Sequence, residues 1–280
     1  MNLLIFLTVA IVFASALKQS AKPALKIGFH PNPHIINGDA AAKGQFPYQI
    51  SYQFGILGVH EHVCGGSILS PTFILTAGHC VTEVPTQGDH RIVAGITELN
   101  EQNNQRQEIQ VVEKIVHPDF NGRVGPNDIA LLKLATPLEF GDLVQPIKLP
   151  EPGSEFTGDS VLTGWGSTST TIVPLLPNHL QTVTVPILTY DDCKKAVDAL
   201  LDENQENPLN EVSNVCTGPL SKGESACLGD SGGPLAQNGT IVGVVSWGFV
   251  PCSHPEAPSV YTKVSSFVDF IKEHVHDLPQ

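Results

Sequence analysis

Short apolar runs alternate with turn-forming residues along the chain from Phe46 onward. Each run has the length of a strand and is rich in β-branched or aromatic residues, and Gly, Pro, Asn and Asp separate one run from the next. This pattern predicts an all-β barrel or sandwich. The runs are YQISYQF, GGSILS, FILTAG, RIVAGI, QEIQVVEKIV, IALLKL, SVLTGWG, QTVTVPIL, GTIVGVVSW and SVYTKV.

Two helices are predicted among these strands. At the C-terminal end, apolar residues recur at helical spacing and would form one face that docks on the barrel surface, with Ser265 or Ser266 as the cap. That face consists of Val264, Phe267, Val268, Ile271 and Val275. The acid-rich segment 189–207, TYDDCKKAVDALLDENQEN, predicts a second, shorter helix that ends in a loop.

The segment QNGT, at 237–240, predicts a hairpin turn between two apolar runs. The same residues form an N-glycosylation acceptor at Asn238, which suits an exposed turn. An unmodified Asn-Gly turn remains equally open.

The first residues carry the features of an export signal. Residues 1–16, MNLLIFLTVAIVFASA, are apolar and end in the Ala-Ser-Ala pattern of a signal-peptidase site. The run is short for a membrane span and no stop-transfer pattern follows, so a membrane anchor is the weaker alternative. Residues 17–34 are polar and proline-spaced without periodicity, which predicts a loose pro-segment. We therefore expect a secreted, extracellular protein.

Charge and cysteine content narrow the class of protein. Acidic residues outnumber basic ones, 28 against 15, and without the three lysines of segment 17–34 the net charge is −16. Such a surface disfavours nucleic acid and anionic membranes as partners. Six cysteines behind an export signal predict disulfides, with 15 possible connectivities, and no C-x-x-C pair indicates zinc. The cysteines are Cys64, Cys80, Cys193, Cys216, Cys227 and Cys252.

Three short segments carry residues suited to chemistry. LTAGHC places His79 after a small-residue turn at the end of an apolar run, and NDIALLKL begins such a run with Asp128. CLGDSGGPL flanks Ser231 with glycines, which allow close backbone approach. The N–H groups of Gly229 and Ser231 could then point at one substrate oxygen, as an oxyanion hole requires.

Together the three segments supply a nucleophile, a base and an orienting acid. The Ser231 hydroxyl is a poor nucleophile until a base removes its proton. His79 would take that proton and later donate it to the leaving amine, while Asp128 would fix the imidazole tautomer and stabilise the imidazolium. The chain order His, Asp, Ser is the order found in chymotrypsin.

On these motifs the chain resembles the chymotrypsin-like serine proteases, and most of all invertebrate chymotrypsins. IING, LTAGHC, NDIALL, TGWG, GDSGGP, SWG and VYTKV appear in family order. The resemblance implies a protease domain at 35–280 built of two six-stranded antiparallel β-barrels, 35–146 and 147–280, with a C-terminal helix and the active site between the barrels. It also implies the disulfides Cys64–Cys80, Cys193–Cys216 and Cys227–Cys252.

The resemblance further implies where the substrate binds. Ser246, Trp247 and Gly248 would form an edge to which the substrate pairs as an extended strand. The primary pocket would have Ser225 at its base with Ala226 beside it, and Gly248 and Ser259 as walls. A pocket for Lys or Arg needs a buried carboxylate, which Ser225 lacks. We therefore expect cleavage after Phe, Tyr or Leu, with an elastase-like or collagenolytic specificity as the alternative.

The resemblance also gives IING a role as a concealed N-terminus. Cutting the His34–Ile35 bond would release an α-amine that pairs with Asp230 and orders the oxyanion hole and the pocket. Relatives are usually cut after Arg or Lys, so His34 departs from the family pattern.

The expected partners are protein or peptide substrates and proteinaceous serine protease inhibitors, and the expected state is a monomer. No cofactor and no metal are expected, because Ile96 stands where trypsin-like members place an acidic calcium ligand and Glu98 and Glu101 look like a solvated loop. A secreted homologue that binds without catalysing is the alternative from another class of function.

Overall fold

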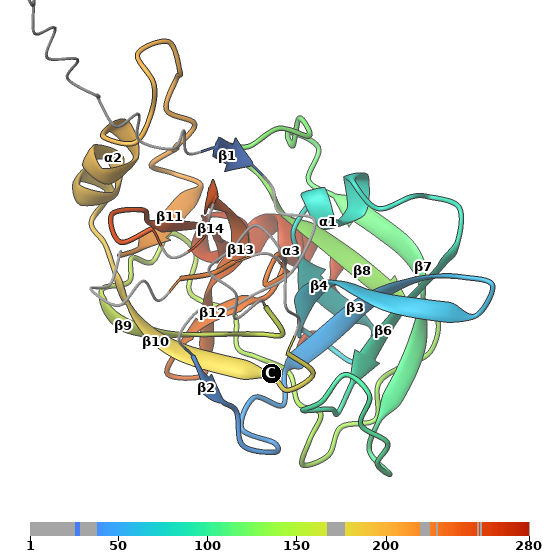
Figure 1. The fold of residues 1–280 in the computed structure, drawn as a ribbon. Coiled ribbons are helices and arrows are strands. Elements are labelled where there is room, and N and C mark those ends of the chain that lie inside the picture. Colours follow the sequence, from blue (N-terminus) through green and yellow to red (C-terminus); the bar gives the residue numbers. More distant parts are fainter. Residues whose placement is uncertain are drawn as a thin grey trace, which may run out of the picture.

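The structure is a computed structural model that describes residues 26–28, 38–166, 177–218, 225–227, 229–250, 252 and 254–279. It contains two β-barrels side by side with few helices (Figure 1). The expected signal peptide, His34 and Ile35 lie outside the described residues.

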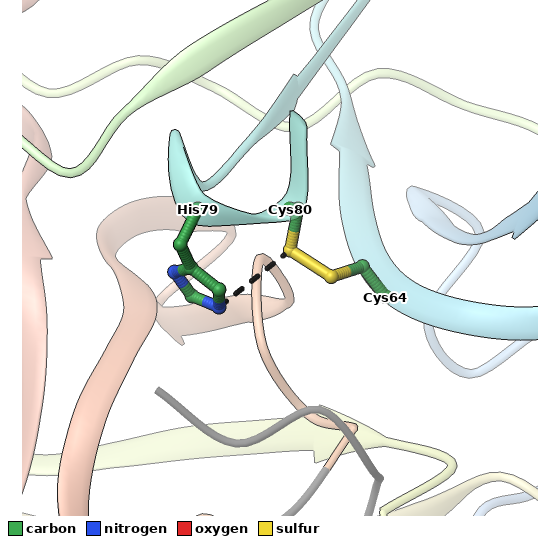
Figure 2. Close-up of side chains that lie close together, drawn as sticks. All are labelled: Cys64, His79 and Cys80. Carbon is green, nitrogen blue, oxygen red and sulfur yellow. Dashed lines mark hydrogen bonds between the residues drawn. A yellow bond between two sulfur atoms is a disulfide. The ribbon is translucent and has the colours of Figure 1, made fainter. Parts of the chain in front are cut away.

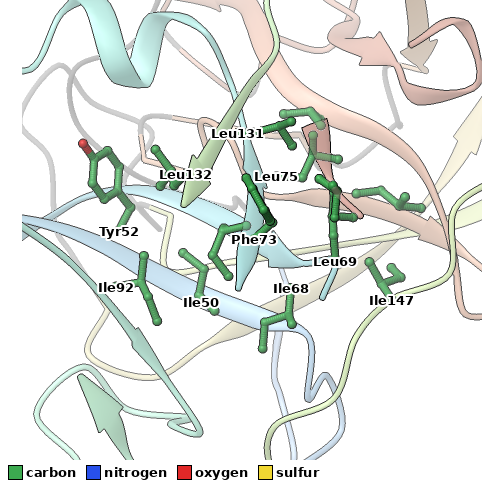
Figure 3. Close-up of a cluster of buried hydrophobic side chains, with 14 of the residues drawn as sticks. Ile50, Tyr52, Ile68, Leu69, Phe73, Leu75, Ile92, Leu131, Leu132 and Ile147 are labelled. Carbon is green, nitrogen blue, oxygen red and sulfur yellow. The ribbon is translucent and has the colours of Figure 1, made fainter. Parts of the chain in front are cut away.

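Six antiparallel strands close the first barrel in the order β3-β4-β5-β8-β7-β6. Their inward-facing apolar side chains fill it, as Figure 3 shows for Ile50, Ile68 and Ile92. A single turn of helix, α1 (His79–Thr82), follows β5. The strands are β3 (Gln49–Ile56), β4 (Val59–Ile68), β5 (Phe73–Thr76), β6 (Asp89–Ala94), β7 (Gln107–Val116) and β8 (Ala130–Leu134).

Six more antiparallel strands form the second barrel, in the order β9-β10-β11-β14-β13-β12 and back to β9. The predicted fold of two six-stranded antiparallel barrels is therefore confirmed. β2 (Asp39–Ala40) adds to β10. The barrel strands are β9 (Gly158–Gly164), β10 (Gln181–Ile187), β11 (Asn214–Thr217), β12 (Pro234–Gln237), β13 (Thr240–Val250) and β14 (Ser259–Lys263).

The segment expected to be a pro-segment contributes one short strand. β1 (Lys26–Gly28) pairs antiparallel with the end of β13. The prediction of a loose segment is wrong for these three residues, because an open sheet edge binds the main-chain N–H and C=O groups of a neighbour and needs no pattern of side chains.

The C-terminal helix lies as predicted but begins later. Val264–Ser266 form a 3₁₀ turn, η1, and α3 (Val268–His274) follows. Neither Ser265 nor Ser266 caps α3, which has no side-chain cap. The five apolar residues of the predicted face are all buried, and four of them join the core of the first barrel. The helix thus ties the end of the second barrel to the first.

The second predicted helix is α2 (Tyr190–Asp198), whose Thr189 side chain accepts a hydrogen bond from the N–H of Asp192. No helix in the described part of the chain has the length and apolar character to cross a membrane. The hairpin between β12 and β13 turns at Asn238 and Gly239, which have φ of 51° and 75° and are exposed. Glycosylation of Asn238 stays a prediction.

All six cysteines are paired, and the pairs are the ones that the resemblance implied: Cys64–Cys80, Cys193–Cys216 and Cys227–Cys252. The first disulfide lies within the first barrel and the other two within the second.

Candidate active site

The pairing of β5 with β8 brings His79 and Asp128 together. Thr76 at the end of β5 lies opposite Ala130 at the start of β8, so the residues just beyond these ends meet at one rim of the barrel. His79 Nδ1 is 2.7 Å from Asp128 Oδ2, and the His79 N–H donates to Oδ1 at 2.8 Å. One carboxyl group therefore holds both the backbone and the imidazole of His79.

Asp128 is fully buried, and hydrogen bonds satisfy its carboxylate. Ser246 Oγ, from β13 of the second barrel, donates to Oδ2 at 2.6 Å. Because His79 Nδ1 donates to this carboxylate, the neutral ring carries its lone pair on Nε2. The arrangement prepares Nε2 to accept a proton.

Ser231 lies in the turn before β12, and Gly232 holds this turn against α1. Gly232 has φ of +76°, and a Cβ there would lie 2.2 Å from Thr76 Oγ1 and 3.1 Å from Cys80 Sγ. Only glycine allows this approach. The N–H of Gly65 donates to the Ser231 carbonyl at 2.8 Å. The chain beside Ser231 thus packs against Cys80, the neighbour of His79.

Figure 2 shows that His79 lies next to the disulfide between Cys64 and Cys80, with Nε2 3.8 Å from Cys80 Sγ. The three side chains are close enough to suggest metal ligands. Both sulfur atoms are consumed by the disulfide, so neither is the thiolate that a metal site of this kind requires. The disulfide instead anchors the start of α1 to β4.

Gly229, one of the two residues expected to form the oxyanion hole, has φ of +96°, a conformation suited to glycine. Hydrogen bonds fix the turn on both sides: Asp230 N–H to Cys227 O at 3.2 Å and Gly232 N–H to Val245 O at 2.9 Å. A third contact holds Gly229 itself, since His62 Nε2 lies 3.3 Å from its carbonyl oxygen.

His62, on β4, was not identified from the sequence. A carbonyl only accepts hydrogen bonds, so Nε2 carries the proton and Nδ1 accepts from Ser51 Oγ at 2.7 Å. Burial lowers the pKa of His62 to about 4, opposed by the bond to Gly229. No local motif marks it, and a register shift in the β3–β4 pairing places it on the opposite face of β4 from Cys64.

Asp230 is fully buried next to Ser231. Its carboxyl group accepts hydrogen bonds from Gly166 N–H and Cys227 N–H, each at 3.1 Å, while burial raises its pKa well above the usual range. Within the described residues no cationic side chain pairs with it. A buried carboxyl group without a cation is costly to ionise.

The family described as Trypsin matches residues 35–271. The chain belongs to the trypsin family of serine endopeptidases. It is 39% identical to Trypsin-1 of Astacus astacus over 85% of this chain and 98% of that protein. It is also 36% identical to Lectizyme of Glossina austeni, over 98% and 96%, and 35% identical to Trypsin of Phaedon cochleariae, over 95% of each.

Membership of the trypsin family makes protein substrates the expected partners. It does not support the special likeness to invertebrate chymotrypsins, because two of these three relatives carry the name trypsin. The side chains expected to line the primary pocket are therefore the best guide to which residue this trypsin-family protease accepts before the scissile bond.

The structure brings two of the expected pocket residues into contact. Ser259 Oγ, on β14, accepts a hydrogen bond from the Ala226 N–H at 3.1 Å, and Ser225 precedes Ala226. Trp247 is buried and Gly248 is partly exposed on β13. Neither Ser225, Ala226 nor Ser259 supplies an acid.

The acidic loop after β6 is less solvated than expected for this trypsin-family protease. Glu101 pairs with Lys43 at 2.9 Å and accepts the Thr97 N–H at 2.8 Å, and its side chain is 18% exposed. Burial would raise the pKa of Glu101, but Lys43 and the backbone donors lower it to about 2. Glu98 is exposed. A lysine thus pairs with the less exposed acid of this loop.

Proposed function

We propose that the chain is a secreted zymogen whose processed form cleaves peptide bonds through an acyl-enzyme on Ser231. The observation that carries this proposal is the pair of buried hydrogen bonds that Asp128 makes with His79 and Ser246, beside the Ser231 turn. The disulfides suit an oxidising, extracellular compartment.

The catalytic roles follow from the hydrogen bonds. His79 Nε2 takes the Ser231 hydroxyl proton as the oxygen attacks the scissile carbonyl, and the proton then passes to the leaving amine. Asp128 holds the ring and stabilises the imidazolium. The N–H groups of Gly229 and Ser231 stabilise the oxyanion. A water molecule then hydrolyses the acyl-enzyme by the same steps in reverse order.

The expected specificity is for large hydrophobic residues before the scissile bond, Phe, Tyr or Leu. Ser225, Ala226 and Ser259 give no buried carboxylate to pair with Lys or Arg, and Asp230 is engaged by two backbone N–H groups. The Ser259 hydroxyl favours the alternative of smaller, elastase-like residues, because it fills space that a glycine would leave open.

Activation follows the cut between His34 and Ile35. The new α-amine, with an ordinary pKa of about 7.7–8.0, would supply a cation to buried Asp230, which pairs with no cationic side chain among the described residues. Asp230 precedes Ser231 and follows Gly229, so its ion pair would order both donors of the oxyanion hole. A protease that accepts histidine, or trimming after an earlier cut, must supply this step.

The test begins with a His34→Arg full chain that trypsin can cut and that is then freed of trypsin. A sulfonyl fluoride should label the cut chain at Ser231, and N-terminal sequencing should read Ile35 first. In a panel of chromogenic peptides, Phe, Tyr and Leu substrates should be cleaved faster than Lys and Arg substrates. The reverse order would refute the specificity.

A matched control separates catalysis from binding alone. The Ser231→Ala chain, cut in the same way, should neither label nor turn over. If the cut wild-type site also fails to label, the chain is a binding homologue and the catalytic proposal is wrong.

A further inference from the structure

β1 occupies the end of β13 that no other described strand covers. β12 pairs with β13 as far as Val244, and β14 as far as Trp247. Beyond them, Gly28 lies opposite Gly248, with Ile27 opposite Phe249 in the same antiparallel register. An open strand edge presents unpaired N–H and C=O groups, so it is a template for an added strand.

The direction of β1 matches the direction required of a substrate. Ser246, which donates to Asp128, lies two residues before Gly248 on β13. Because β1 is antiparallel, its chain runs from Val250 towards Gly248, and so towards the side chains of the triad. The proposed substrate strand uses Ser246, Trp247 and Gly248, so both strands require the edge at Gly248.

Charge favours the same pairing. Segment 17–34 carries three lysines and no acid, while the remainder of the chain after the signal has a net charge of −16. Attraction between the two supplements main-chain hydrogen bonds, which are the source of affinity when a strand is added to a sheet edge.

The pairing of β1 with β13 depends on the covalent link between segment 17–34 and the rest of the chain, so a cut at His34–Ile35 would allow β1 to dissociate. A covalently attached segment acts at an effective concentration of about 1 mM, which sustains pairing that is weak in solution. Every cysteine lies at position 64 or beyond, so no disulfide would hold segment 17–34 after a cut at His34–Ile35.

We propose that Lys26–Gly28 is a tethered, substrate-like strand that occupies the Gly248–Val250 edge and excludes substrate until the pro-segment is cut free. This autoinhibition rests on the proposed function, since it assigns the same edge to substrate. It differs from the Asp230 switch, because it blocks binding rather than ordering the oxyanion hole.

The first experiment needs no catalysis. In the uncut full chain carrying Ser231→Ala, hydrogen exchange is measured at Gly248, Phe249 and Val250 and compared with that of Ile27→Pro and Gly28→Pro variants. Neighbouring residues of a strand direct their N–H groups to opposite sides, so at least one proline removes a ladder bond. We expect at least about tenfold faster exchange in one variant. Ile27→Ala, which keeps the backbone donor, should exchange as the parent does.

The second experiment uses the cut His34→Arg enzyme with a synthetic 17–34 peptide. At about 1 mM peptide, the KM for a long peptide substrate should rise about twofold or more, with kcat unchanged. An ester of a single amino acid has no preceding residues to pair with the Gly248–Val250 edge, so its KM should rise less than that of the long peptide. A scrambled peptide of the same composition controls for charge alone.

The outcomes separate the two proposals. If neither proline changes exchange at Gly248–Val250, or if the scrambled peptide inhibits equally, autoinhibition by this strand is wrong. If exchange responds but the cut enzyme has no activity and takes no label, the strand pairing stands and the proposed catalytic function fails.

Discussion

Protonation of His62 should appear as a loss of stability in mild acid. Burial gives this side chain a pKa of about 4 in the folded protein, against 6.5 for an ordinary histidine. Between these values the unfolded chain binds a proton that the folded chain does not. The stability is thus fully present above pH 6.5 and is lost as the pH falls towards 4.

The magnitude follows from the same two values. Lowering the pH from 7 to 5 should cost about 2 kcal/mol if the folded pKa is about 4. The ring is only partly buried, and solvent contact reduces the cost, so we expect about 1–2 kcal/mol. Protonation also removes the acceptor of the Ser51 hydroxyl while leaving the donor to Gly229.

The assay is urea unfolding of the full chain with intact disulfides, in a Ser231→Ala background that prevents self-digestion. His62→Gln retains an amide that can donate to Gly229 but does not titrate. The difference in unfolding free energy between parent and variant should shift by about 1–2 kcal/mol between pH 7 and pH 5. His60→Gln, in the same strand but in contact with Asp89, controls for the loss of an imidazole as such. A pH-independent difference for His62→Gln would refute the reasoning.

Three further substitutions test the site itself. Asp128→Asn should lower kcat about 10⁴-fold in the processed enzyme by stabilising the wrong imidazole tautomer, and steady-state kinetics would measure it; a change under tenfold would contradict the assigned role. Asp230→Asn should leave the circular dichroism of the processed protein unchanged but remove more than about 99% of turnover, since the Ile35 amine loses its partner; near-normal turnover would contradict the activation proposal. Ser225→Asp should shift the ratio of kcat/KM towards Lys and Arg substrates by about 10²-fold, and an unchanged ratio would show that Ser225 is not the pocket base.

The sequence predicted the longer strands well because each is a run rich in β-branched or aromatic residues with turn-forming residues at its ends. The run QEIQVVEKIV coincides with β7, and the five apolar positions at the C-terminus are all buried. β11 was missed, and β12 was indicated only as the apolar run before the predicted QNGT turn; each has four residues. Strands this short show no period of two, and they exist because β9, β13 and β14 offer partners from distant parts of the chain.

The catalytic residues that lie in short characteristic motifs could be predicted from the sequence. His79, Asp128 and Ser231 each lie in a short segment with characteristic neighbours, and the order of the segments supplies the rest. His62 has no such motif, and its role depends on a contact with Gly229, 167 residues away. The pairing of Lys43 with Glu101 likewise depends on the fold of the loop. Such contacts between residues far apart in the sequence arise only once the chain has folded.

The disulfides and the hydrogen bonds of the active site connect different parts of the fold. Each disulfide closes a loop within one barrel, so the disulfides stabilise the barrels without fixing them to each other. The alignment of the site instead depends on hydrogen bonds that cross between barrels, from Ser246 to Asp128 and from His62 to Gly229, and on α3 packed into the first-barrel core. The second barrel therefore helps to hold Asp128 of the first barrel in place, and the first barrel helps to hold Gly229 of the second. The site keeps this geometry only as long as the two barrels remain docked.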